Sequence, residues 1–176
     1  MTTDPETSLP QTGHEGPYDA PVRVTGMRVL PDWIDYNGHM NVAYYTVATD
    51  AALDRMLEDH LGLGETFVAA TRMGPYALQA NYSYLAEMHE GDGFSVLIRL
   101  LDHDAKRMHL VLEMIRDGDG SLAARVETLL MNVDLEARRS AAYPEWGQAR
   151  MTEMVRCHAA LPAPDGIGQP IGIRKR

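Results

Sequence analysis

One long stretch of residues has its apolar side chains at helical spacing, and several strand-like stretches follow it. This order limits the folds that the sequence can adopt. Between residues 41 and 60, apolar side chains recur at intervals of three and four, and Gly62 and Gly64 end the run. Turns that contain Gly and Asp separate several of the later runs, which favours antiparallel hairpins. The pattern predicts an α+β domain with one long helix, and the extended runs span residues 66–73, 76–88, 94–102, 108–116 and 121–134.

The flanking residues set the expected limits of the domain. Residues 1–20 are polar and rich in Pro and Gly, with little to bury, which indicates a flexible N-terminal arm. Alternation over residues 22–30 predicts a first strand. We expect the domain itself to cover residues 21–143. Residues 144–176 are expected to form a short helix, over 146–160, and a tail rich in Pro and Gly.

The overall charge argues against two classes of partner. The 176 residues carry a formal net charge of −9, whereas nucleic acids and anionic membranes are bound through basic surfaces. The N-terminus has no signal-peptide pattern, and no apolar run is long enough to span a membrane. The single cysteine, Cys157, rules out an intrachain disulfide and is compatible with a reducing cytoplasm. We therefore expect a cytoplasmic protein that binds neither nucleic acid nor membrane.

Several common chemistries lack their sequence motifs. The seven histidines form no H-E-x-x-H pair, and one cysteine cannot build a zinc-thiolate site. The chain also has no G-x-S-x-G elbow, no P-loop and no G-x-G-x-x-G after a strand. We expect no metal and no cofactor. Of the chemistries considered, hydrolysis that uses a carboxylate side chain remains.

Polar residues crowd between the first strand and the helix. Asp35, Asn37, His39 and Asn41 each need a hydrogen-bond partner when they are removed from water, so such a cluster usually has a task. Asn41 is a good N-cap residue, and the free N–H groups of the first helical turn would face this cluster. The alternative is a capped loop in which Asp35 and Asn37 only bind turn N–H groups. His39 would then be a surface or core histidine whose ring nitrogens are hydrogen-bonded.

The order of these features resembles the hotdog-fold thioesterases, in particular the 4-hydroxybenzoyl-CoA thioesterase-like group. The resemblance spans roughly residues 21–143. Residues 35–38 match the D-x-x-G of that group, in which the Asp is nucleophile or general base, and residues 35–41 resemble the D-x-N-x-H-[VM]-N of acyl-carrier-protein thioesterases. It implies a single hotdog domain, with the antiparallel sheet wrapped around the central helix. Residues 104–109 and 129–134 further resemble the carnitine-catabolism branch, which hydrolyses betainyl-CoA.

The resemblance implies roles for the residues of the motif. Asp35 would attack the thioester carbonyl or activate water, and these two routes stay open. Asn37 would orient the water or the carboxylate, and His39 would assist proton transfer or hold the loop. The carbonyl oxygen would lie against backbone N–H groups at the start of the helix, which involves Gly38, Asn41 and Val42.

The remaining expectations concern the ligand and the assembly. Trp33, Tyr36, Tyr44 and Tyr45 flank Asp35. With Tyr82 and Tyr84, on a strand expected to lie nearby, they would form an aromatic box that suits the trimethylammonium group of a small acyl-CoA. Lys106 and Arg107 are candidates for binding the phosphates of coenzyme A. Hotdog domains commonly pair, so the resemblance implies a homodimer or homotetramer. Two other functions stay open, namely a non-catalytic acyl-CoA-binding module and a hotdog enoyl-CoA hydratase, although the longer G-D-x-N-P-x-H hydratase pattern is absent.

Overall fold

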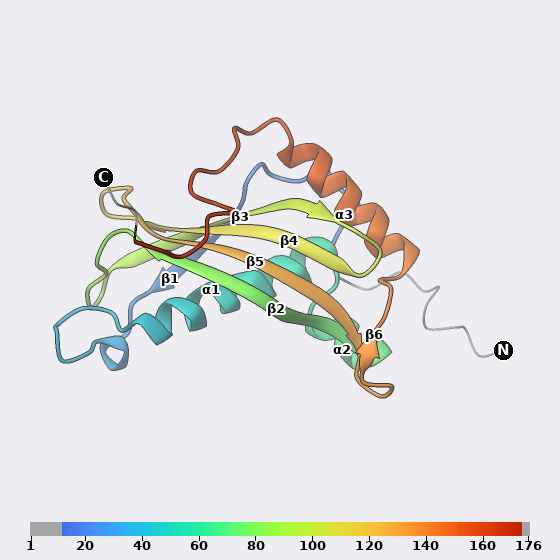
Figure 1. Cartoon of the computed structure of the whole chain (residues 1–176), viewed down its shortest axis with the longest axis horizontal. Helices are drawn as coiled ribbons and strands as arrows, with labels where there is room; N and C mark the ends of the chain where they lie inside the picture. The colour runs from blue at the N-terminus through green and yellow to red at the C-terminus, as the bar shows by residue number, and fades with distance from the viewer. Residues whose placement is uncertain (1–11, 174–176) are drawn as a thin grey trace.

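One curved antiparallel sheet and one long helix make up most of the molecule (Figure 1). A computed structural model describes residues 12–173. The sheet order is β1-β3-β4-β5-β2, with β6 added beside β5, and every pairing is antiparallel. The strands are β1 (Val22–Arg28), β2 (Met73–Tyr84), β3 (Gly93–His103), β4 (Arg107–Arg116), β5 (Leu122–Asp134) and β6 (Arg139–Ser140). The helices are α1 (Val42–Met56), α2 (Glu65–Thr71) and α3 (Glu145–His158), with a 3-10 turn η1 (Pro31–Trp33) and a π-helical turn η2 (Leu57–Leu61).

Helix α1 lies along the concave face of the sheet, as the sequence predicts (Figure 1). Its apolar positions are buried at helical spacing, and alternate residues of β3 and β4 face them, because successive strand residues point to opposite faces. The helix continues through η2 to Gly62, whose positive φ of 67° ends it. The expected helix over residues 41–60 and the wrapped sheet are therefore confirmed. The buried residues of α1 are Tyr45, Ala48, Thr49, Ala52, Leu53 and Met56.

The prediction of an extended segment over residues 66–73 is wrong. Residues 65–71 form α2, and β2 begins only at Met73. The Thr66 N–H donates to the Glu58 carboxylate at 3.1 Å, and Phe67 is buried with its ring edge-on to Trp146. The contact of Phe67 with Trp146 joins residues far apart in the chain, so the strand-like composition of this segment gives way to tertiary packing.

Strand β2 is also shorter at its far end than the predicted 76–88. It leaves the sheet after Tyr84, where the Leu85 and Ala86 N–H groups both donate to the Ala123 carbonyl. Residues 85–92 then form an irregular segment that reaches the start of α1. Pro75 is tolerated within β2 because this strand is at the edge of the sheet.

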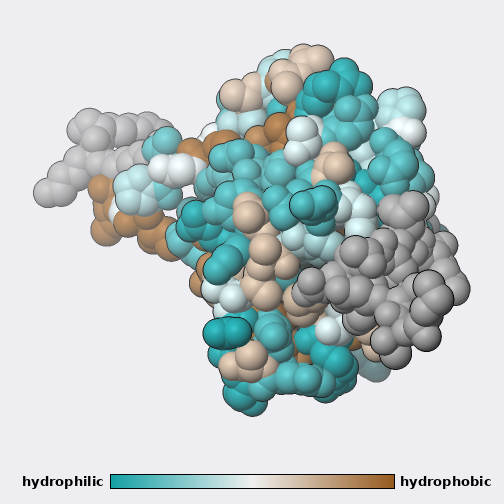
Figure 2. Space-filling model, turned by 90° about the vertical axis from the view of Figure 1, so that its right-hand side faces the viewer, coloured by the Kyte–Doolittle hydropathy of each residue, from teal (hydrophilic) through white to brown (hydrophobic). Residues whose placement is uncertain are grey.

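Both ends of the described chain pack on the domain, in contrast to the loose arm and tail that the composition suggests. Tyr18 is buried, and the Arg150 guanidinium donates to the Thr12 carbonyl at 3.1 Å. In the tail, the Gly168 N–H donates to Glu127 at 2.7 Å. The domain limits remain an expectation, and residues 1–11 lie outside the described part. At the end of the molecule that carries β6, hydrophilic side chains cover most of the visible surface (Figure 2).

Helix α3 covers a gap left by the short strand β1. β1 pairs with β3 only as far as Ile98, so the next part of that edge of β3 has no strand beside it. His158, at the end of α3, accepts the Leu100 N–H at its Nδ1 (3.0 Å). Within residues 12–173, no helix is long and apolar enough to cross a membrane.

Candidate active site

The motif between β1 and α1 folds into a compact loop. The Asp35 N–H donates to the His39 carbonyl and the Gly38 N–H donates to the Asp35 carbonyl, both at 3.0 Å. Ile34 and Met40 close the loop with a β-bridge. Gly38 has a φ of 83°, in the left-handed region that favours glycine. Residues 34–40 are thus held by their own backbone, which positions the side chains between them.

The two oxygens of the Asp35 carboxylate have different surroundings. Oδ1 accepts the Asn37 N–H at 2.8 Å, which is the turn contact expected of a purely structural aspartate. Oδ2 lies 3.9 Å from His39 Nε2 and accepts no hydrogen bond from any described residue. The side chain is 13% exposed. One oxygen therefore fixes the carboxylate, and the other can react. The Asn37 side chain is exposed.

His39 lies between two carboxylates. Its Nε2 faces Asp35, and its Nδ1 is 3.6 Å from Glu87 Oε1. Both distances exceed a normal hydrogen bond, so these are electrostatic neighbours that become ion pairs when the imidazole is protonated. Glu87 could not be predicted as a site residue, because it lies within residues 76–88, which the sequence predicts to be extended. Only the departure of residues 85–92 from the sheet brings Glu87 to the loop.

The start of α1 offers one free backbone N–H group to a substrate, whereas two were expected, those of Asn41 and Val42. Asn41 caps the helix as predicted, since its side-chain oxygen accepts the Ala43 N–H at 3.0 Å. The Asn41 N–H, however, donates to the Trp33 carbonyl at 2.9 Å, so the expectation that it faces the substrate is wrong. Among residues 12–173 the Val42 N–H has no hydrogen-bond partner. It is therefore the donor that remains for an oxyanion.

A cavity of about 270 Å³ opens beside the loop and the first turn of α1. This volume lies just below the usual range for drug-sized ligands, about 300 to 1,000 Å³, and so suits a small group. His39 forms part of the wall, and Asp35, which does not line the cavity, has its Oδ2 3.9 Å from the His39 ring. The lining residues are His39, Met40, Val42, Tyr45, Tyr84, Leu85, Ala86 and Glu87.

The predicted aromatic box is only partly present. Tyr45 lines the cavity, and its ring lies edge-on to Tyr84 with centroids 5.2 Å apart. Trp33 and Tyr44 stack on each other instead, with centroids 5.4 Å apart, and are absent from the cavity wall. Tyr36 is 96% exposed. The aromatic walls thus come from Tyr45 and from Tyr84 of β2, which was expected to lie nearby, whereas Tyr82 is absent from the cavity wall.

Lys106 and Arg107 lie at the opposite end of the sheet from the loop within one chain. Arg107 of β4 pairs with Met131 of β5, which in turn pairs with Tyr76 of β2. The cavity residue Tyr84 is eight residues further along β2. At about 3.3 Å per residue this is roughly 26 Å. Arg107 also forms a bidentate contact with Asp104, whose pKa is lowered to about 2, chiefly by that hydrogen bond. A single chain does not bring these cations to Asp35.

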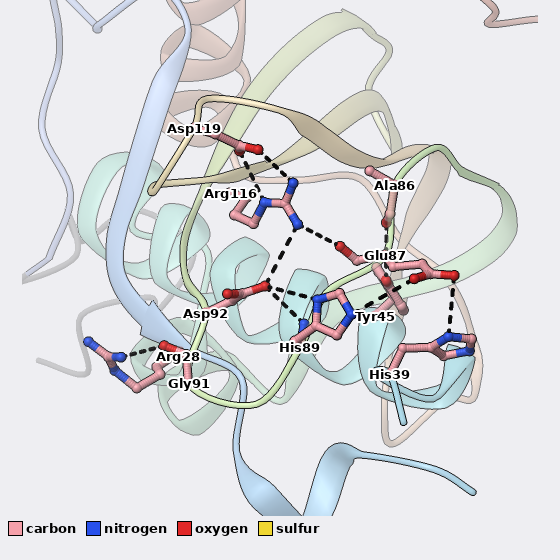
Figure 3. Close-up of polar contacts among 10 residues, drawn as sticks. All are labelled: Arg28, His39, Tyr45, Ala86, Glu87, His89, Gly91, Asp92, Arg116 and Asp119. Carbon is pink, nitrogen blue, oxygen red and sulfur yellow. Dashed lines mark hydrogen bonds and ion pairs between the residues drawn. The ribbon is translucent and has the colours of Figure 1, made fainter. Parts of the chain in front are cut away.

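A network of charged groups surrounds Glu87 (Figure 3). His89 Nε2 lies 3.8 Å from its carboxylate, and Arg116 donates to its backbone carbonyl at 3.0 Å. The Arg116 guanidinium is itself held by Asp119, whose pKa is lowered mainly by this hydrogen bond. In the described chain, no three His, Cys, Asp or Glu side chains are grouped to hold a metal ion.

Comparisons with known proteins agree on one family. Residues 29–151 match the model of the thioesterase-like superfamily. A betainyl-CoA thioesterase of Pseudomonas aeruginosa is 35% identical over 145 residues, which cover 82% of this chain and 91% of that protein. An L-carnitine dehydrogenase/betainyl-CoA thioesterase of Agrobacterium fabrum is 33% identical over 156 residues, or 89% of this chain but only 31% of that longer protein.

Solved structures show the same likeness. A hypothetical protein of Staphylococcus aureus, solved in complex with CoA, superposes with a TM-score of 0.81 at 28% identity, covering 90% of this chain and 99% of that one. A putative thioesterase of Pseudomonas putida superposes with a TM-score of 0.74 at 29% identity, covering 91% and 99% of the two chains.

Proposed function

The chain belongs to the thioesterase-like superfamily and is an acyl-CoA thioester hydrolase, and from this premise we propose that it uses Asp35 to hydrolyse a small, cationic acyl-CoA such as betainyl-CoA. The observation that carries the proposal is the shared location of three features. Val42, whose N–H has no partner among the described residues, the tyrosines Tyr45 and Tyr84, and His39 beside Asp35 all line one small cavity.

In the proposed reaction, the thioester carbonyl oxygen accepts the Val42 N–H. This donor is aligned before the reaction, and one such donor typically lowers the barrier by about 3 kcal/mol. The Asp35 carboxylate either attacks the carbonyl carbon to form an anhydride, or removes a proton from the water that attacks it. In both routes the C–S bond breaks and the CoA thiolate takes up a proton. In the anhydride route a water molecule then cleaves the anhydride, which restores the Asp35 carboxylate. The acyl group leaves as the free acid in both routes. His39 is in place to transfer protons, because it lines the cavity and its Nε2 lies 3.9 Å from Asp35 Oδ2.

The size of the cavity and its aromatic walls support the proposed acyl group. A trimethylammonium group cannot donate hydrogen bonds and is best recognised by ring faces, each contact contributing about 0.5 to 2 kcal/mol. Tyr45 and Tyr84 supply two rings. The Pseudomonas aeruginosa relative, named for its action on betainyl-CoA, is similar over most of both chains, which supports the same substrate here.

We also propose that the protein assembles as a homodimer or a homotetramer. β2 is an edge strand, and Tyr76 and Leu78 on it are 54% and 50% exposed. Antiparallel pairing of two β2 strands would bring the Lys106 end of one copy toward the Asp35 end of the other. CoA phosphates could then meet cations that a single chain keeps distant. We also retain the cytoplasmic location as a prediction, since Cys157 is free.

The substrate is tested by comparing two acyl groups of the same shape. 3,3-Dimethylbutyryl-CoA replaces the quaternary nitrogen of betainyl-CoA by carbon and so removes only the charge. Release of free CoA thiol gives kcat/KM for each substrate, with butyryl-CoA as a straight-chain reference. We expect betainyl-CoA to exceed its neutral isostere by about tenfold or more. A preference for either neutral substrate would show that the cavity is a general acyl pocket.

A further inference from the structure

The cavity beside the loop has an asymmetric charge. Of the described residues that line it, Glu87 is the only one with a carboxylate, and none is a lysine or an arginine. His39 also lines the cavity, and it carries a positive charge only when its imidazole is protonated. With neutral imidazole, the cavity therefore carries a single negative charge and suits a cationic group.

Glu87 is anchored through its backbone, which leaves its carboxylate available. Arg116 donates to the Glu87 carbonyl at 3.0 Å, and the Tyr45 hydroxyl donates to the neighbouring Ala86 carbonyl at 3.4 Å. The nearest guanidinium does not neutralise the side chain, because Arg116 binds Asp119 through two nitrogens and lies 3.9 Å from Asp92. In Figure 3 the Glu87 carboxylate points between the two imidazoles of His39 and His89.

The carboxylate and the aromatic rings belong to the same surface. The Tyr45 ring is 4% exposed, and Tyr84 packs edge-on against it at 5.2 Å. Burial raises the pKa of the Tyr45 hydroxyl and the Glu87 carboxylate adds to that rise. The Tyr45 hydroxyl consequently stays neutral, and the negative charge at this wall is that of Glu87.

We propose that Glu87, with Tyr45 and Tyr84, forms the subsite that selects a positively charged acyl group, an assignment that rests on the proposed function. The rings supply faces for the methyl groups of a quaternary ammonium, and the carboxylate supplies the counter-charge in the same cavity wall. Glu87 is thus a specificity-determining residue. Asp35 and the Val42 N–H perform the hydrolysis, and Glu87 decides which acyl group is hydrolysed fastest.

Glu87→Gln tests the assignment, because it removes the charge and keeps the shape. Glu87 is 68% exposed, so the variant is expected to fold normally. Glu90→Gln is the matched control, with the same charge change on the same segment at an exposed position outside the cavity wall. The readout is the ratio of kcat/KM for betainyl-CoA to kcat/KM for 3,3-dimethylbutyryl-CoA in the wild type and in both variants.

We expect Glu87→Gln to lower this ratio by about tenfold, through loss of activity on betainyl-CoA alone, while Glu90→Gln leaves it within about twofold. An unchanged ratio in Glu87→Gln, in an enzyme whose wild type prefers betainyl-CoA, overturns the assignment and leaves the proposed function standing. An equal loss on both substrates also overturns it, since Glu87 would then act by positioning His39. A wild type without preference for the charged substrate overturns the proposed function itself.

Discussion

The buried imidazole of His158 makes stability depend on pH. Its side chain is 2% exposed, its Nδ1 accepts the Leu100 N–H, and its Nε2 lies 3.0 Å from the Asp19 carbonyl. Because one nitrogen must accept and the other donates, this arrangement requires the neutral ring. Burial, above all, lowers the pKa of His158 from its ordinary value of 6.5. Its contribution to stability is therefore complete above pH 6.5 and is lost as the pH falls toward the lowered pKa.

We predict that His158→Asn flattens the pH dependence of stability. Below pH 6.5, His158 binds a proton in the unfolded state but not in the folded state. This lowers the free energy of unfolding by up to about 1.4 kcal/mol per pH unit. The free energy of unfolding, measured in urea between pH 7.5 and 5.5, should fall more steeply in the wild type than in the variant. His60, whose pKa is also lowered by burial and by His14, contributes to the slope that remains. Equal slopes in the two proteins would contradict this account.

At the residue scale, the sequence predicts groups whose partners are close in the chain. The Asn41 cap and the Asp35 turn contact lie within two residues of their partners, so local spacing is enough to find them. Tyr84 could be expected near the motif, because it lies on a strand of the sheet that wraps the helix. Glu87 could not be, because its approach to Val42 depends on where β2 ends, and that end does not follow from local pattern.

At the scale of elements, one buried side chain of α3 contacts the N-terminal segment at more than one point. The Arg150 guanidinium, 5% exposed, pairs with Glu15 at 2.8 Å and donates to the carbonyls of Thr12 and Leu61. It also lies over the Trp146 ring, 5.1 Å from the centroid. One side chain thus ties α3, the end of η2 and the residues before β1.

Arg150→Leu is predicted to lower the free energy of unfolding by about 3 kcal/mol, since buried carbonyls lose a charged donor. Glu15→Gln should cost less than about 1 kcal/mol, because the Glu15 carboxylate is 64% exposed and its ion pair is screened. Urea unfolding of both variants checks the contrast. Losses of similar size would mean that the ion pair, and not the carbonyl contacts, holds the segment.

The elements that the sequence predicts well are those with a strong internal period. The long helix and the hairpins of β3, β4 and β5 follow from spacing and turn residues within each segment. Helix α2 does not, because its start depends on Glu58 and its buried face on Trp146. For the same reason the packing of residues 12–20 could not be predicted from composition, since it relies on Arg150 of a distant helix.

At the scale of the whole molecule, the exposed edge strand predicts self-association. Light scattering at micromolar concentration should give a mass at least twice the 19.5 kDa of one chain. Leu78→Lys places a charge on the β2 edge and should shift the protein toward the monomer, because edge lysines oppose strand pairing. Turnover should fall with dimer content if the partner supplies CoA-binding cations. A wild-type mass near 19.5 kDa would contradict the expected assembly.

The central claim, that Asp35 carries the hydrolysis, is tested most directly by the turnover of Asp35→Asn. The asparagine oxygen can still accept the Asn37 N–H, so the loop should keep its shape, and circular dichroism checks the fold. Asp32→Asn, an exposed acid three residues earlier, is the matched control. We predict that Asp35→Asn lowers the rate of CoA release by about a thousandfold, while Asp32→Asn stays near the wild-type rate. Near-normal turnover in a folded Asp35→Asn protein would contradict the account.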